Sequence, residues 1–159
     1  MESFADYKPI FDINMNDVIK VIMSYDEVKK SIIDYNQSQL QAGIDSQGKR
    51  IITTSAKDQR LGNVYSTYTI RIKAQKGQDT ENVTLEDTGD FYNSMLVKIS
   101  DDHVEVIADF DKPDGNIYDN FDIGKFDFLG LTNENLEGFA TWVIQDYLEL
   151  ELRKRLHFS

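Results

Sequence analysis

The residues of this chain that could do chemistry are mostly carboxylates, and several of them gather in one turn-rich segment. Ca²⁺ binds several carboxylate and carbonyl oxygens, and a calcium loop places its acids at alternate positions before a glycine. The acids near Gly115 do not have that spacing, and no glutamate stands at the closing position. We interpret the segment as a solvated acidic loop, with a structural cation as the alternative, and predict no metal site. The acids are Asp109, Asp111, Asp114, Asp119 and Asp122.

A metal-dependent nuclease is a further alternative, because two acids share one predicted strand. Glu105 and Asp109 lie on it, and carboxylates can hold the pair of metal ions used in phosphoryl transfer. A lysine commonly follows such a carboxylate by two residues, but Ile107 and Asp111 occupy those positions. The nuclease is therefore the less favoured alternative.

Neither histidine of the chain has an evident catalytic partner in the sequence. His103 is next to a predicted hairpin turn, and His157 is near the C-terminus. Nucleophilic catalysis needs a nucleophile with a base held beside it. The chain has no cysteine, which excludes disulfides and thiolate chemistry, and no glycine loop of a nucleotide-binding type. The sequence predicts a protein that is not an enzyme and has no cofactor.

The composition predicts one acidic, globular domain. The chain has 159 residues, of which 40% are hydrophobic and 11% aromatic, enough to bury a core. Its formal net charge of −11 argues against specific binding of nucleic acid, which requires neutralisation of phosphates. No apolar run reaches the length of a membrane span, and the acidic N-terminus does not have the basic start of a signal peptide. We expect a soluble protein with no membrane partner.

The N-terminal half combines an arm, a long helix and a long loop. Residues 1–14 hold a proline and aromatics without helical spacing, which predicts an extended arm before a single domain over residues 15–159. Apolar residues then recur at steps of three and four, which predicts an amphipathic helix over Asn16–Ala42 that ends at Gly43. Residues 45–65 are polar and predict a loop.

The C-terminal half predicts a hairpin and a second long helix. Apolar and polar residues alternate over Ser66–Lys76, which favours a strand, and again over 95–99 and 103–109, which predicts a hairpin. Thr132 or Asn133 is expected to cap the final helix. The fold class is α+β, with two long amphipathic helices packed on a small, mainly antiparallel β-sheet. The apolar stripe of the final helix comprises Leu136, Phe139, Val143, Tyr147 and Leu150.

Four short motifs follow one another in an order that is typical of a known family. They are Gly43-Ile44-Asp45 with Gly48, the segment Thr69–Gly77, Asp87-Thr88-Gly89, and Leu129-Gly130-Leu131-Thr132. Over Val18–Leu156 the chain resembles the virion-morphogenesis or tail-completion proteins of tailed bacteriophages, which are head–tail connector subunits.

The resemblance implies a structural, non-enzymatic phage virion protein of the neck or tail, assembled in the host cytoplasm. Such a subunit forms an oligomeric ring at the head–tail (portal–tail) junction or completes the tail. Its partners would be further copies of itself in a ring homo-oligomer, the portal or adaptor protein, and tail proteins. DNA would pass through the ring without specific binding. The resemblance also implies a short helix, rather than a strand, at Ser66–Lys76.

Contacts between subunits are expected at aromatic and aliphatic residues in the arm, in the loop and before the final helix. They are Tyr7, Phe11, Ile51, Ile52, Phe126 and Phe128. Packing within the subunit itself is the alternative for each of them. Phe91 and Tyr92 are expected to serve the core.

A small basic patch, Arg71, Lys73 and Lys76, is expected to pair with an acidic face of a neighbouring subunit, with simple solvation as the alternative. A function of a different class is a monomeric acidic binding or inhibitor module that mimics DNA. Such a mimic needs a regular stripe of carboxylates on one face. The acids of this chain are scattered over predicted turns, strands and helices, which disfavours it.

Overall fold

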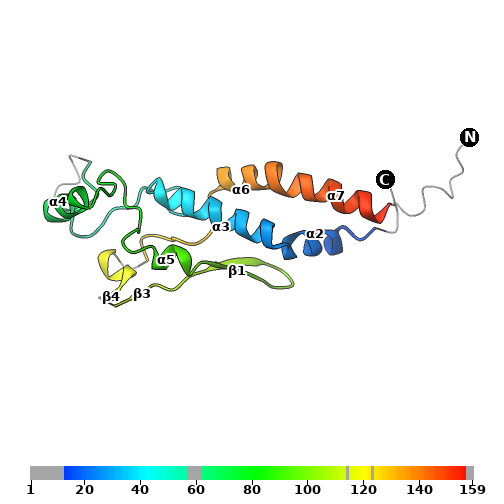
Figure 1. Ribbon diagram of the computed structural model, residues 1–159, viewed down its shortest axis with the longest axis horizontal. Coiled ribbons are helices and arrows are strands. Elements are labelled where there is room, and N and C mark those ends of the chain that lie inside the picture. Colours follow the sequence, from blue (N-terminus) through cyan, green and yellow to red (C-terminus); the bar gives the residue numbers. More distant parts are fainter. Residues whose placement is uncertain (1–12, 57–61, 114, 123, 157–159) are drawn as a thin grey trace, which may run out of the picture.

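The computed structural model describes residues 13–56, 62–113, 115–122 and 124–156. They form an elongated molecule with a layer of antiparallel helices beside a β-hairpin (Figure 1). In the layer, α2 and α3 follow one another, and the last helical segment of the chain packs against them. A shorter helix, α4, projects at one end (Figure 1). The fold is mixed α+β, as predicted.

The first helix of the layer is interrupted at Tyr25. The segment α2 spans Met15–Ser24 and α3 spans Asp26–Gln41, whereas the sequence predicted one continuous helix. Tyr25 has an extended backbone (ψ 136°), its ring centroid lies 5.5 Å from that of Tyr147, and its hydroxyl donates to Glu151. The backbone at Tyr25 is therefore not helical, and the prediction of one continuous helix was wrong.

The end of α3 has the predicted glycine. Gly43 has a φ of +72°, and its amide donates to the carbonyl of Leu40 (2.8 Å). A Cβ at this position would lie 3.0 Å from the Cβ of Asn82. Both the left-handed backbone and the close approach therefore require glycine.

The ambiguous segment after the loop is a helix. The helix α4 spans Thr67–Gln75, and the side chain of Ser66 caps it by accepting a hydrogen bond from the amide of Thr69 (3.1 Å). The alternation that favoured a strand was therefore a misleading signal. None of the residues of α4 is fully buried.

Two separate two-stranded antiparallel sheets replace the single predicted sheet. The strand β1 (Leu96–Ile99) pairs with β2 (Val104–Ile107), which confirms the predicted hairpin. A much shorter ribbon, β3 (Asp111–Lys112) with β4 (Gly115–Asn116), leads into the 3₁₀-helix η3 (Ile117–Asn120). The arrangement of two long helices on one sheet is therefore not confirmed.

The last helical segment contains a π-helical turn. The helix α6 (Asn133–Phe139) begins after Thr132, whose hydroxyl caps it as predicted by accepting a hydrogen bond from the amide of Asn135 (3.2 Å). The π-helical turn η4 (Ala140–Ile144) follows, and α7 (Gln145–Arg155) completes the segment.

The π-helical turn changes which side chains face the helical layer. A π turn is wider than an α turn, so an apolar stripe with α-helical spacing loses its register beyond it. Phe139 is buried, but Leu150, predicted on the same face, is exposed, and Glu151 is buried instead. Leu136, in the first turn of α6, is exposed as well. The predicted stripe was wrong at these two leucines.

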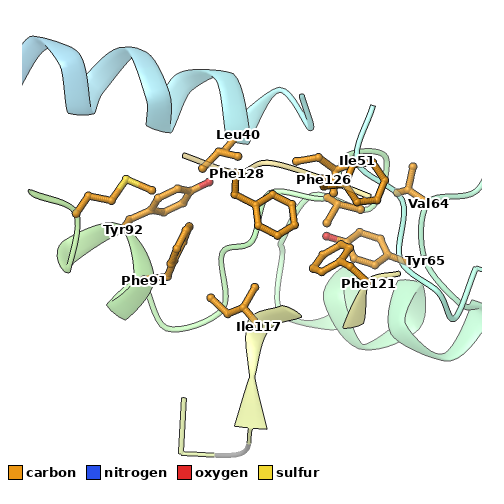
Figure 2. Close-up of a cluster of buried hydrophobic side chains, with 12 residues drawn as sticks. Leu40, Ile51, Val64, Tyr65, Phe91, Tyr92, Ile117, Phe121, Phe126 and Phe128 are labelled. Carbon is orange, nitrogen blue, oxygen red and sulfur yellow. The ribbon is translucent and has the colours of Figure 1, made fainter. Parts of the chain in front are cut away.

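Two groups of buried apolar side chains stabilise the fold, and α3 contributes to both. We call them the aromatic core (Figure 2) and the helical core. The helix α5 (Asp90–Asn93) supplies Phe91 and Tyr92 to the aromatic core, as predicted. The aromatic core comprises Leu40, Ile51, Val64, Tyr65, Val83, Phe91, Tyr92, Met95, Ile117, Phe121, Phe126 and Phe128. The helical core comprises Val18, Ile22, Val28, Ile32, Val106 and Phe139.

Candidate functional site

Three of the residues predicted to contact neighbouring subunits lie inside the aromatic core. Ile51, Phe126 and Phe128 are buried, and Figure 2 shows Phe128 at the centre of the cluster. The ring of Phe128 lies 4.9 Å from that of Phe121, centroid to centroid. Side chains enclosed in this way favour the alternative, packing within the subunit itself, over contact with a neighbouring subunit.

The remaining predicted contact residues have different positions. Ile52 is partly buried and packs against the aromatic core. Tyr7 and Phe11 lie outside the described residues, so their assignment stays a prediction.

Two buried amide side chains of α3 hold the segment that contains Phe128. Asn36 donates to the carbonyl of Phe128 (3.0 Å) and accepts from the amide of Gly130 (3.4 Å). Gln39 donates to the carbonyl of Gly130 (3.2 Å) and accepts from the amide of Thr132 (2.8 Å). Sequence analysis missed both amides. The signal in the sequence was the position of Asn36: it lies four residues after Ile32, so it falls on the apolar face of the helix although it is polar.

A buried carboxylate makes a similar connection at the end of the helical layer. Asp45 accepts hydrogen bonds from the amides of Gln47 (3.0 Å), Lys49 (2.7 Å) and Asp127 (3.4 Å). The amide of Ser46 donates in turn to the carbonyl of Asp127 (2.8 Å). The first motif is thereby joined to Asp127, two residues before the motif Leu129–Thr132, although the two lie far apart in the sequence. Their role in the described structure is to support the fold.

Asp114 lies outside the described residues, and the other candidate metal-binding acids do not converge. Asp109 accepts from the amide of Asp111 (2.9 Å), and Asp111 and Asp119 each accept from Asn116 (2.8 and 3.1 Å). These carboxylates cap turns of the second ribbon and η3. Within the described ranges, no three residues of metal-binding type are grouped so that they could hold an ion.

The catalytic candidates are likewise dispersed over exposed positions. His103 pairs with its neighbour Asp102 (2.7 Å) on the hairpin turn, and both side chains are exposed. Glu105 is exposed on β2. His157 lies outside the described part of the chain. Among the helices that the structure describes, none is long and apolar enough to cross a bilayer.

A pocket of about 370 Å³ lies between α4 and η3. Burial lowers the pKa of Lys73, against the opposing effect of Asp87, and raises the pKa of Tyr65 to about 12. Three lysines and three acids line the pocket, so it favours neither anions nor cations. The charged residues are Lys73, Lys76, Lys112, Glu86, Asp87 and Asp119.

The outward face of α4 carries a large exposed aromatic ring. Tyr68 is 75% exposed, and Arg71 and Gln75 follow it on the same face at helical spacing. We call these three residues the α4 surface. The helix α4 lies at the end of the molecule (Figure 1), and all three of these residues are exposed.

The predicted basic patch is divided by contacts within the subunit. The Nζ of Lys73 lies 5.1 Å from the ring centroid of Tyr65, and Lys76 pairs with Asp87 (3.3 Å). Arg71 makes no ion pair with any residue that the structure describes. Arg71 is therefore the cation of this patch that a second molecule could pair with.

A second exposed surface lies on the last helical segment. Trp142, the single tryptophan of the chain, is 74% exposed in the π-helical turn. Asp146 and Leu150, four residues apart in the α7 helix that follows, are exposed as well, and Glu149 lies beside them. We call these four residues the α7 surface. Glu149 pairs with Arg153 (2.7 Å), whereas Asp146 has no ion pair among the described residues.

A third exposed surface is the outer face of the β-hairpin. Leu96 and Ile107 are directly paired and exposed, Leu96 by 60%, while Val97 and Val106 point towards the helical core. We call Leu96 and Ile107 the hairpin surface. None of these three surfaces was singled out from the sequence, because an apolar residue on a helix or strand is ordinarily expected to face the core.

Comparison with protein-family models, with curated proteins and with solved structures found no match.

Proposed function

We propose that the protein is a structural, non-enzymatic subunit of a tailed-phage virion, located in the neck or tail. It forms an oligomeric ring at the portal–tail junction or completes the tail. The observation that carries the proposal is the exposure of large apolar side chains on three separate elements, represented by Tyr68, Leu96 and Trp142.

The number of surfaces supports an assembly subunit over a monomeric module. A ring subunit has two different faces for its two neighbours, since a head-to-tail contact joins unlike surfaces. It needs a further face for the portal, adaptor or tail protein on which the ring sits. Exposed apolar patches on soluble proteins commonly mark such contacts. The α4, α7 and hairpin surfaces match this requirement, whereas an inhibitor that binds one target needs one surface.

The net charge of −11 supports a passage for DNA without binding. Affinity for DNA rises with the number of phosphates that a protein neutralises. A ring whose lumen is lined by Asp and Glu side chains would repel the genome, so the DNA would not adhere during its passage.

The test is cryo-electron microscopy of portal particles incubated with the purified protein, and of virions. We expect density for this chain as a ring at the portal–tail junction, or at the end of the tail if it completes the tail. The variant Leu96→Lys tests the hairpin surface in the same experiment. Because Leu96 is exposed, the variant is expected to fold, so a loss of density would show that the ring needs the hairpin surface. Absence of the protein from virions, or a ring with a basic lumen, would contradict the proposal.

A further inference from the structure

We infer that the α4 surface of one copy of this protein docks on the α7 surface of the next copy. The inference rests on the proposed function and names the two faces through which neighbouring subunits meet. It commits to a second copy of this chain as the partner.

The first argument is the position of α4. This helix has no fully buried residue, and it projects at the end of the molecule (Figure 1). Among the described residues, its inner face makes the contacts that hold it: Ile70 packs against the aromatic core, and Lys73 lies over Tyr65. Tyr68, in contrast, is 75% exposed. An element held on one face, with a large aromatic on the other, is suited to insertion against a partner.

The second argument is the way in which the π-helical turn presents Trp142. Single π turns within α-helices are frequent at functional sites. Here the turn leaves the ring 74% exposed, whereas Phe139, three residues earlier, is buried. Tryptophan, tyrosine and arginine are the residues that most often dominate the binding energy of interfaces. The α4 surface holds two of these three types, and the α7 surface holds the third.

The third argument is charge. The helix α4 contains basic residues and no acid, and Arg71 has no ion pair within the described structure. The α7 surface holds Trp142 and the exposed carboxylate of Asp146, which has no ion pair among the described residues. A guanidinium can pair with a carboxylate and stack on an indole ring at the same time. The α4 surface therefore supplies the cation, and the α7 surface supplies the carboxylate and the indole ring with which it can pair.

The overall charge favours this local pairing. Two copies that each carry −11 repel one another, so unspecific association is disfavoured. A contact that brings a basic group against an acidic one offsets this repulsion locally. Complementary patches of this kind determine orientation more than affinity. The pairing of unlike faces gives a head-to-tail assembly, which closes into a ring when the rotation between copies allows it.

The first experiment uses crosslinking, which the absence of native cysteine makes specific. Ala74 and Gln145 are exposed beside the two surfaces. In the full chain, Ala74→Cys/Gln145→Cys treated with a short bifunctional thiol reagent is expected to give a ladder of multimers. Each single variant is expected to give little or no dimer. The same double variant with Tyr68→Ala is expected to lose the ladder about tenfold or more. The pair Ala74→Cys/Glu105→Cys, which joins α4 to the hairpin, is the matched control and is expected to give no ladder.

The second experiment tests direction by mixing two defective variants in sedimentation velocity. Tyr68→Ala has a defective α4 surface, and Trp142→Ala has a defective α7 surface. Each alone is expected to be monomeric, and their mixture is expected to stop at a 1:1 dimer, because one intact surface of each kind remains. Circular dichroism checks that both variants are folded.

The two experiments also separate this inference from the proposed function. Absence of a ladder from the double-cysteine variant, or an unchanged ladder after Tyr68→Ala, overturns the inference. A mixture that stays monomeric overturns it as well. If the chain nevertheless forms a ring in virions, only the pairing of these faces is wrong. A ladder from a protein that virions do not contain leaves the pairing intact and overturns the proposed location.

Discussion

Among single residues, Asn36 is a polar side chain in a fully buried position, where its amide must be hydrogen-bonded. Its amide is fully buried and satisfies one carbonyl and one backbone amide of the segment before the last helix. Buried backbone groups that lose their partner incur the cost of desolvation without compensation. Gln39 does the same one turn later. The attachment of the last helical segment to α3 therefore depends on two side chains in addition to apolar packing.

The substitution Asn36→Ala is expected to lower the free energy of unfolding by about 2–3 kcal/mol, because it leaves the carbonyl of Phe128 and the amide of Gly130 unpaired. Urea denaturation measures this difference. Asn93→Ala, at an exposed position, is the control and is expected to stay within about 0.5 kcal/mol of the wild type. Equal stabilities of the two variants would show that the Asn36 hydrogen bonds do not matter.

The second prediction at this scale concerns the pH dependence of stability. Glu151 is buried and accepts hydrogen bonds from Lys154 (2.7 Å) and from Tyr25. The bonds from Lys154 and Tyr25, in that order, lower the pKa of Glu151 below its ordinary value of 4.5, and the charge of Arg155 adds to this effect.

A carboxyl group whose pKa is lower in the folded state stabilises the fold above its unfolded pKa. That contribution is lost as the pH falls through the folded pKa. Glu151→Gln is therefore expected to be less stable than the wild type at neutral pH and to approach it as the pH falls below 4.5. Unfolding free energies of both proteins across this range provide the measurement. A difference that does not change with pH would contradict the assignment.

Among the elements, the π-helical turn has the largest consequence, since it determines the direction of everything in α7. The wider turn places Glu151 on the inner face and leaves Trp142 on the outer one. A π turn of this kind corresponds to one residue inserted into an α-helix. Removing one residue within it would restore α-helical geometry without rotating α7.

Deletion of Thr141 is accordingly expected to leave the protein folded, with a thermal midpoint close to that of the wild type. Deletion of Glu149, within α7, is expected to cost about 2 kcal/mol or more, because it rotates Glu151 away from Tyr25. Thermal denaturation followed by circular dichroism compares the two.

The sequence predicted those elements whose signals are local. The Thr132 cap, Gly43 and the β1–β2 hairpin all depend on residues close to them in the chain. The break at Tyr25 and the π-helical turn were missed, because the apolar spacing continues across both. At the break, Tyr25 contacts Tyr147 and Glu151, which are more than a hundred residues away in the chain.

The same limit explains why the sequence could not distinguish residues of the core from residues that contact another subunit. An apolar side chain in a loop must leave water, and the sequence does not say whether its own core or a partner covers it. Ile51, Phe126 and Phe128 are covered by their own core. Conversely, Tyr68 and Trp142 lie on helices, where apolar residues ordinarily face inward, and both are exposed.

For the whole molecule, the three exposed surfaces are separate enough to be disabled one at a time. The hairpin surface lies on the sheet, and the α4 and α7 surfaces lie on helices (Figure 1). Substitutions at exposed positions usually change stability by about 0.5 kcal/mol or less. Each surface can therefore be tested in a folded protein.

Leu96→Lys is expected to leave the thermal midpoint and the crosslinked ladder unchanged while it abolishes binding to portal particles, because a charge would replace the exposed leucine. Co-sedimentation of the protein with the particles measures the binding. The reverse pattern, a lost ladder with binding retained, would assign the hairpin to contacts between copies.

The hydrogen bonds between α3 and the segment after Phe128 have a consequence for biosynthesis. Asn36 and its partner Phe128 are 92 residues apart in the chain. The α2 and α3 helices therefore emerge from the ribosome long before the backbone groups that their amides bind have been made. Until then, the apolar faces of Val28 and Ile32 lack the cover of Phe139, and contacts this distant in sequence form slowly. The nascent chain is thus vulnerable to aggregation until the last helical segment has been made, and a chaperone that shields α2 and α3 would act in that interval.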